Sequence, residues 1–210
     1  MDRHRYRIRF SKEGDLRFIS HRDLVRAMER TFRRAGLALR MSEGFHPKPR
    51  MNFPSALALG IEGADEIMEL ELEEPRPADA LLADLRTHAP PGMQFRSAEL
   101  LPPGAPKAAV CRACFAMPIP PERRESLKQR IDQFLAERSH CVVRPDRDRS
   151  VDIRPLVESL GLVDGQLRMS LQVRPGGSAR PREVLEALHV ADVEQNGCYL
   201  TRTAVELQQA

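Results

Sequence analysis

The chain has 210 residues, of which 41% are hydrophobic, enough for one large core or two small ones, and two compact domains are expected. Lys and Arg total 33 against 30 Asp and Glu, and the resulting net charge of +3 neither requires nor excludes a nucleic-acid partner. No run approaches the roughly 18 apolar residues of a membrane span, and the charged start MDRHRYRIRF lacks the apolar core of a signal peptide, so we expect a cytoplasmic protein with no membrane partner.

The first half of the chain carries alternating strand and helix patterns. Period-two alternation predicts half-buried strands, and apolar residues at helical spacing predict amphipathic helices. The clearest helix follows Ser20, because Ser20 is a good N-cap, Asp23 lies three residues on and Gly36 ends the pattern. The predicted elements are a strand at 5–10, the helix between Ser20 and Gly36, strands at 37–41 and 66–74, a helix at 77–89 and a strand at 93–100.

A proline-rich segment separates the two halves, and the same order of elements recurs after it. The later elements are a strand at 110–119, a helix at 121–138, strands at 140–145 and 166–173, a helix at 181–188 and a strand at 198–207. The helix at 121–138 is expected to bury one side, which carries Leu127, Ile131, Phe134 and Leu135. Residues 150–165 fit less well and predict an inserted strand or turn. The expected fold class is α+β, with two tandem ferredoxin-like (βαββαβ) domains at 1–100 and 110–210 and a linker at 101–109.

Arginines alternate with apolar residues in the first predicted strand, as on an RNA-binding sheet. In a ferredoxin-like sheet, however, the first and third strands are neighbours, so cross-strand ion pairs with the glutamates of 66–74 are favoured. The sheet also lacks the exposed aromatic pairs on which bases stack. The arginines are Arg3, Arg5, Arg7 and Arg9, and the glutamates are Glu69, Glu71 and Glu73.

A second group of arginines lies on the helix that follows Ser20 and forms a basic stripe beside the apolar one. These side chains could bind phosphates, or they could form an ordinary solvated face in which Glu29 and nearby carboxylates pair with some of them. The group consists of Arg22, Arg26, Arg30, Arg33 and Arg34.

The segment SEGFHPKPRMNFPSALALG, Ser42 to Gly60, combines a turn-forming glycine, aromatic rings and rigid prolines. Prolines fix their own φ and restrict the preceding residue, which indicates a stiff recognition loop whose aromatic ring could stack on a base while its cations meet phosphates. The alternative is a stiff connection that buries Phe45 and Phe53 in the core. The candidate binding residues are Gly44, Phe45, His46, Pro47, Lys48, Pro49 and Arg50.

Candidates for catalysis are few. His21 lies in the first turn of a helix, where the cationic form of imidazole is disfavoured, and His46 lies in the loop. Cys111 and Cys114 would point to opposite faces of a strand, so no metal site is predicted there. No cofactor is expected, since the sequence has neither a glycine-rich phosphate loop nor the CxxxCxxC motif of a radical S-adenosylmethionine (SAM) enzyme.

Residues 9–72, from RFSKEGDLRFISHRDLVRAMERTFRRAGL through SEGFHPKPR to EIMELEL, resemble the radical-SAM-linked protein family almost end to end, and VDIRPLVESL is similar to a later segment of that family. The family is a domain of unknown function fused to, or encoded beside, radical SAM proteins. The resemblance implies a stand-alone form whose partner is a separately encoded radical SAM enzyme. Relatives often have Asn where this chain has His46, which weakens a proton-transfer role for that residue.

Three functions remain open. The chain could be a non-catalytic protein that binds RNA or a ribonucleoprotein substrate and presents it to a separate radical SAM enzyme. It could be a protein-interaction adaptor without RNA binding, in which the proline-rich loop docks on that enzyme. By analogy of fold alone, it could be a metal-independent RNA endonuclease of the CRISPR repeat-processing type, with His21 or His46 activating a ribose hydroxyl.

Overall fold

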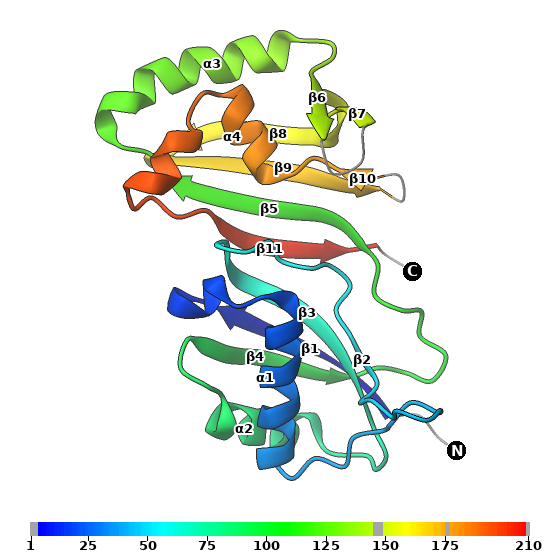
Figure 1. The fold of residues 1–210 in the computed structure, drawn as a ribbon. Coiled ribbons are helices and arrows are strands. Elements are labelled where there is room, and N and C mark those ends of the chain that lie inside the picture. Colours follow the sequence, from blue (N-terminus) through cyan, green and yellow to red (C-terminus); the bar gives the residue numbers. More distant parts are fainter. Residues whose placement is uncertain (1–3, 145–148, 175–176, 209–210) are drawn as a thin grey trace. The chain divides into compact units, whose positions relative to one another are not determined.

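The computed structural model describes residues 4–144, 149–174 and 177–208. The chain forms two compact units. Unit 1 consists of Met1–Ala109 and Gln208–Ala210, and unit 2 consists of Val110–Leu207. Each unit has an antiparallel sheet with helices beside it, so the protein belongs to the α+β class (Figure 1). No helix within the described ranges is both long and apolar enough to cross a membrane.

An antiparallel sheet with helices on one face forms unit 1. Its elements are β1 (His4–Lys12), the 3-10 helix η1 (Gly14–Phe18), α1 (His21–Arg34), β2 (Met51–Asn52), β3 (Glu62–Leu72), α2 (Ala78–His88) and β4 (Met93–Leu100). The strands lie in the order β4-β1-β3-β2, and every neighbouring pair is antiparallel. Helices α1 and α2 cover the same face of this sheet (Figure 1).

The core of unit 1 lies between the sheet and these helices. Tyr6, Ile8 and Phe10 alternate along β1 and are each at most 1% exposed, which confirms the period-two prediction for residues 5–10. The apolar residues that alternate on β3 complete this inner layer, and they are Met68, Leu70 and Leu72. The opposite faces of both strands therefore carry the charged residues.

Helix α1 begins and ends as its sequence predicts. The hydroxyl of Ser20 accepts a hydrogen bond of 3.2 Å from the backbone N–H of Asp23, which satisfies one of the free donors at the helix start. Gly36 follows the helix with φ +63°, a left-handed conformation that glycine adopts without steric cost. The buried face of α1 consists of Leu24, Ala27, Met28, Thr31 and Phe32.

The strand predicted at 37–41 is wrong as a continuous element. Only isolated bridges form there, between Leu39 and Leu72 and between Met41 and Pro49. The strand that pairs with β3 over a longer stretch is β2, within the segment expected to be a loop. The pattern of apolar residues is present at 37–41, but the edge of β3 is divided between this segment and β2, so neither forms a long strand.

Unit 2 repeats the plan with an added hairpin. Its elements are β5 (Val110–Pro118), η2 (Pro121–Arg123), α3 (Arg124–Ala136), β6 (Cys141–Arg144), β7 (Arg149–Asp152), η4 (Arg154–Leu156), β8 (Val157–Val163), β9 (Gln166–Arg174), β10 (Gly177–Ser178), α4 (Pro181–Ala187), η5 (Ala191–Asn196) and β11 (Thr201–Leu207). The main sheet has the order β11-β5-β9, and β8 and β10 both pair with β9. Strands β6 and β7 form a separate hairpin.

Two predictions for this half need correction. The segment 140–145 was expected to join the main sheet, but β6 pairs with β7, and β8 takes the position beside β9 instead. Leu135 was expected on the buried side of the helix, yet it is 36% exposed, whereas Leu127, Ile131 and Phe134 are buried as predicted. The extra strand anticipated within 150–165 is confirmed.

Candidate functional site: a proline-stiffened hairpin and the cavity at its base

Residues 38–52 form a hairpin that leaves the edge of β3 and returns to it. Its arms are joined by backbone hydrogen bonds from the N–H of Ser42 to the carbonyl of Lys48 (2.7 Å) and from the N–H of Arg50 to the carbonyl of Arg40 (2.8 Å). The hydroxyl of Ser42 also accepts a hydrogen bond from the N–H of Lys48, at 3.0 Å. These bonds fix the base of the hairpin and leave residues 43–47 as its tip.

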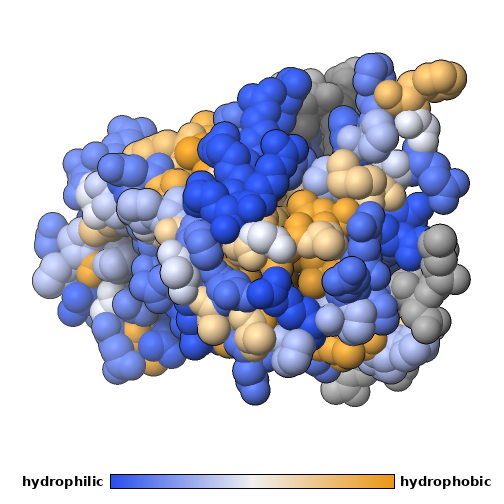
Figure 2. Space-filling model, turned by 90° about the horizontal axis from the view of Figure 1, so that it is seen from below, coloured by the Kyte–Doolittle hydropathy of each residue, from blue (hydrophilic) through white to orange (hydrophobic). Residues whose placement is uncertain are grey.

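The tip presents an aromatic ring to solvent. Gly44 has φ +123°, a conformation that other residues rarely adopt, and Phe45 directly after it is fully exposed (102%). The alternative in which Phe45 packs into the core is therefore wrong. Figure 2 shows a face of the molecule on which apolar patches lie between hydrophilic residues. Phe45 has the highest exposed fraction of the large hydrophobic residues in the described part of the chain.

The other phenylalanine of this segment is a packing residue. Phe53 is half-buried, and its ring lies edge-on to Phe10 at 6.3 Å and to the ring of His21 at 5.3 Å. This contact places His21 at the start of α1 beside the end of the hairpin. His46 lies at the exposed tip. No hydrogen bond joins the two histidines in the part of the chain that the structure describes, so they do not form an acid–base pair.

Arg50 anchors the base of the hairpin. Its Nε donates to the carbonyl of Met41 at 3.3 Å, and its guanidinium lies 3.7 Å from the carboxylate of Glu43 and 3.9 Å from that of Glu71. Arg40 approaches the same Glu71 oxygen at 3.8 Å. Lys48, by contrast, is exposed. Arg50 is therefore partly neutralised within the protein, whereas Lys48 remains open to a ligand.

The arginines predicted on the first helix all lie on the exposed face of α1. Arg26 pairs with Asp23 at 3.4 Å, and Arg34 donates to the carbonyl of His88 at 2.6 Å. The side chains of three of these arginines make no hydrogen bond or ion pair among residues 4–144, 149–174 and 177–208, and they are Arg22, Arg30 and Arg33. The predicted pairing with Glu29 is not seen there either.

Asp23 is the main carboxylate near these arginines. The hydroxyl of Ser20 donates to Asp23 at 2.7 Å, and this bond, aided by the charges of Arg26 and Arg22, holds the pKa of Asp23 below its ordinary value of 3.8. Asp23 is thus ionised at neutral pH and offsets part of the positive charge at the start of α1. The remaining arginines are closer to the end of the helix and are not offset in this way.

The arginines of β1 are only partly paired as predicted. Arg7 and Glu69 form a cross-strand ion pair of 3.1 Å, which confirms the expectation for this pair. Arg9 pairs with Asp65, and Arg5 donates to the carbonyls of Ala105 and Pro106. The cross-strand prediction is wrong for these two because Arg9 faces Ile67 in the register and the Glu71 opposite Arg5 is held by Arg40 and Arg50. Arg3 lies outside the described residues.

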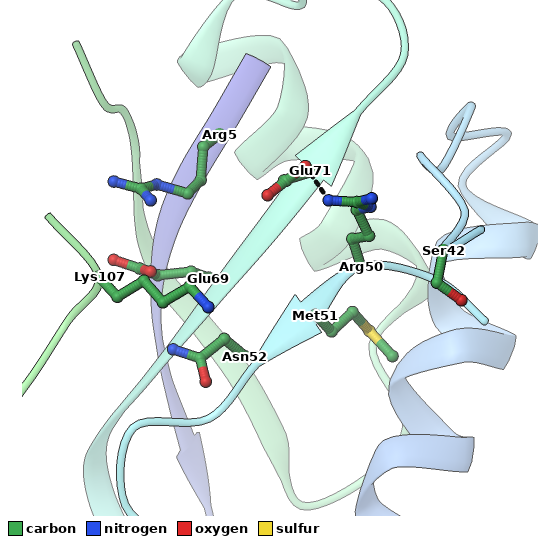
Figure 3. A pocket seen from close by; sticks show the side chains of 8 residues that line it. All are labelled: Arg5, Ser42, Arg50, Met51, Asn52, Glu69, Glu71 and Lys107. Atoms are coloured by element: carbon green, nitrogen blue, oxygen red, sulfur yellow. Dashed lines mark ion pairs between the residues drawn. The ribbon is translucent and has the colours of Figure 1, made fainter. Parts of the chain in front are cut away.

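A cavity of about 330 Å³ opens at the base of the hairpin, on the charged face of the sheet (Figure 3). Its lining combines cations and carboxylates from four separate segments: Arg5, Ser42, Arg50, Met51, Asn52, Glu69, Glu71 and Lys107. Of these, only Arg50 was among the binding residues predicted from the sequence. Lys107 is the single cation within PPGAPKAAV, and this was a sequence signal for it. The predicted linker that contains Lys107 lies against Arg5, which donates to the carbonyl of Pro106.

The cysteines lie apart from this site. Cys111 contacts the carbonyl of Glu206 at 3.6 Å, and Cys114 contacts the hydroxyl of Ser170 at 4.0 Å. Burial raises the pKa of the Cys114 thiol, which makes the thiolate a minor species at neutral pH. Across the described ranges, no group of His, Cys, Asp and Glu side chains is arranged to hold a metal ion.

Residues 5–181 match a protein family described as an uncharacterized protein conserved in bacteria, DUF2344. The chain belongs to this family. The DUF2344 match contains the hairpin, α1 and every residue that lines the cavity. The family description names no activity, so the expected link to radical SAM enzymes stays a prediction.

Other comparisons add little to the DUF2344 assignment. A solved structure described as the crystal structure of an unknown protein from Galdieria sulphuraria has 11% sequence identity and a TM-score of 0.31, with 99% of this chain and 100% of that chain covered. No curated protein matches the sequence.

Proposed function

We propose that this protein is a non-catalytic binding module that captures RNA, or an RNA-containing particle, and presents it to a separately encoded radical SAM enzyme. The observation that carries the proposal is the fully exposed ring of Phe45 at the tip of a hydrogen-bonded hairpin. Bases stack on such rings without sequence preference, and each stacked base contributes roughly 1–3 kcal/mol. Because the hairpin is already ordered, binding would cost little conformational entropy.

Electrostatics supports the same proposal. Lys48 lies three residues from Phe45 and is exposed, so it could meet the phosphate of a stacked nucleotide. Arg30 and Arg33 on α1 offer further positive charge that no ion pair in the described residues offsets, and Arg22 adds charge that Asp23 offsets only in part. No hydrogen bond or ion pair links α1 arginines to the hairpin tip in the described residues, so the two groups would contact different phosphates of one strand.

The partnership with a radical SAM enzyme rests on the resemblance of residues 9–72 to the radical-SAM-linked family. The chain has no CxxxCxxC motif with which to hold the iron–sulfur cluster of such an enzyme, so any radical chemistry would be supplied by the partner.

RNA binding is tested by fluorescence anisotropy with labelled single-stranded RNA at several salt concentrations. We expect affinity to fall as salt rises, and Phe45→Ala to weaken binding by about 5- to 150-fold, the equivalent of one stacked base. Phe18→Ala is the matched control, because Phe18 is also exposed (57%) but lies under Arg17, outside the hairpin. Equal effects of the two substitutions, or no binding at low salt, would contradict the proposal.

The α1 arginines are tested in the same assay. The triple substitution Arg22→Gln, Arg30→Gln and Arg33→Gln should weaken binding at all RNA sequences alike and reduce its salt dependence. The control removes exposed charge from α3 of unit 2 with Arg130→Gln. A triple variant with the salt dependence of the wild type would show that α1 contacts no phosphate.

Protein docking is the second candidate, and the same ring favours it. An exposed aromatic side chain flanked by prolines is a typical anchor for a partner's pocket. Co-purification with the radical enzyme that survives nuclease treatment and is lost in Phe45→Ala, without RNA binding, would favour the adaptor over the RNA-binding module.

We also infer that each unit is a ferredoxin-like domain. The orders β4-β1-β3-β2 in unit 1 and β11-β5-β9-β8 in unit 2 support this, since both are antiparallel and the helices follow the first and third strand of each set. An experimentally determined structure with a different strand order would contradict the inference.

A further inference from the structure

The cavity at the base of the hairpin combines opposite charges in one small space. It lies on the face of β1 and β3 that points away from Tyr6 and Leu70, and the segment around Lys107 forms one wall. Figure 3 shows Lys107 and Asn52 directed toward the same space as Glu69, with Glu71 between Arg5 and Arg50. At about 330 Å³ the volume is at the lower end of the range for small-molecule sites.

Side chains with hydrogen-bond donors line one side of the cavity. Arg5 is fixed in place because its Nη2 donates to the carbonyls of Ala105 and Pro106, which leaves its other nitrogens available. The side chains of Lys107 and Asn52 have no hydrogen bond or ion pair within the described ranges, although both line the cavity. Together these groups could hold a carboxylate.

Acceptors lie on the other side. The Oε2 atom of Glu71 is inaccessible to water and has no hydrogen bond, because the guanidinium groups of Arg40 and Arg50 stop at 3.8 and 3.9 Å. Glu69 is 3% exposed, and its Oε1 alone pairs with Arg7. Since Oε2 of Glu71 is enclosed, a ligand would donate to the other carboxylate oxygen of Glu71, which points away from Arg50 toward the side of Arg5 (Figure 3), and to Glu69. Such hydrogen bonds would stabilise carboxylates that have few partners of their own.

The charges select the kind of ligand. Arg5, Arg50 and Lys107 contribute three positive charges to the lining, and Glu69 and Glu71 contribute two negative charges. A phosphate dianion would be repelled by both glutamates, and a simple amine by the three cations. A molecule with one carboxylate and one ammonium group can satisfy both sides at once.

We propose that this cavity binds a free α-amino acid, with the carboxylate on Arg5 and Lys107 and the ammonium group on Glu69 and Glu71. Asn52, the last residue of β2, would also donate to the carboxylate. The unfilled part of the cavity would receive the amino-acid side chain. This site is separate from the Phe45 tip, so its occupancy does not depend on whether the protein binds RNA.

The test uses the full-length protein, with each proteinogenic amino acid added in turn at millimolar concentration and unfolding followed by calorimetry. For any amino acid that raises the melting temperature, isothermal titration gives its Kd and those of its N-acetyl and carboxamide derivatives. Each derivative lacks one charge, so both should bind about tenfold to hundredfold more weakly than the free amino acid. Inorganic phosphate and a nucleoside monophosphate complete the panel, to detect an anion site instead.

Variants assign the binding to this cavity. Lys107→Met removes an exposed cation that the fold does not need and should weaken binding about tenfold to hundredfold, whereas Lys128→Met on α3 should leave the Kd unchanged. Asn52→Ala is a second variant that keeps the charges and should also weaken binding. The proposal is overturned if no amino acid binds, if phosphate or the N-acetyl derivative binds as tightly as the free amino acid, or if Lys107→Met binds like the wild type.

Discussion

Arg144 and Glu183 form a buried two-pronged ion pair. The Nε and Nη2 atoms of Arg144 donate to the two carboxylate oxygens of Glu183 at 2.6 and 2.7 Å, and Nη2 also donates to the carbonyl of Ser178. The side chains are only 7% and 11% exposed. This pair joins the β6–β7 hairpin to α4.

Removal of one partner should therefore destabilise unit 2. Arg144→Met leaves the buried Glu183 with only the more distant guanidinium of Arg180, at 3.9 Å, and we expect the free energy of unfolding to fall by about 3–5 kcal/mol, as measured by urea denaturation. The double substitution Arg144→Met and Glu183→Met should recover part of this loss, because no unpaired charge remains. A single variant as stable as the wild type would show that the pair contributes nothing.

Two glycines with nearly the same φ allow the effect of steric crowding on stability to be distinguished from that of backbone strain. Gly92 and Gly104 have φ +80° and +79°, but a Cβ at Gly92 would lie 2.7 Å from the carbonyl oxygen of Glu13, whereas one at Gly104 would meet nothing within 4 Å. Gly92→Ala should thus lower the free energy of unfolding by about 1–3 kcal/mol more than Gly104→Ala. Equal losses in the two variants would mean that the turn at Gly92 relaxes.

The cap of α1 should make a measurable contribution. Ser20→Ala removes the acceptor for the N–H of Asp23, and the expected cost is about 1 kcal/mol in the free energy of unfolding. Ser97→Ala serves as the control, because Ser97 is exposed on β4 and its hydroxyl makes no hydrogen bond in the described part of the chain. The prediction fails if the two substitutions change stability equally.

Stability in acid should depend on Asp152. Its carboxylate accepts backbone hydrogen bonds from His140 at 2.9 Å and from Arg154 at 3.1 Å, and these bonds, the first above all, hold the pKa of Asp152 below its ordinary value of 3.8. Because the folded pKa is the lower one, the stabilisation is present above pH 3.8 and is lost as pH falls through the folded pKa.

The prediction for Asp152 is tested by measuring the free energy of unfolding at pH values from neutral to below 3.8. Asp152→Asn should be less stable than the wild type at neutral pH and should lose less stability on acidification. Asp132→Asn, at an exposed position of α3, should keep the slope of the wild type. Parallel curves for Asp152→Asn and the wild type would show that the carboxylate is not linked to folding.

The elements that sequence predicted well are those fixed by local patterns. Residues 5–10 alternate regardless of their partner, and Ser20 and Gly36 mark the ends of α1 by their own backbone preferences. The segment 37–41 failed because its pairing depends on which part of β3 remains available, and that is decided by β2. The residues of one segment do not indicate the register in which it pairs with a distant strand.

The hairpin of the candidate site was partly predictable from the sequence, whereas the cavity was not. The glycine and prolines of the hairpin are neighbours in sequence, so a stiff tip could be inferred, although the exposure of Phe45 could not. The cavity brings Arg5 and Lys107 together across about half the chain, and neither residue is unusual in its own surroundings. Spacing within one segment cannot reveal such a site.

The division of the outer edge of β3 has a further consequence. A strand edge with free N–H and carbonyl groups can add a strand from another molecule and start aggregation. The N–H of Glu73 bonds to Ala38, the carbonyl of Glu71 accepts from Arg40, and the N–H of Glu71 bonds to Arg50, so both arms of the hairpin cover this edge. The hairpin that exposes Phe45 therefore also covers the edge of β3 at residues 69–73, where another strand could otherwise add.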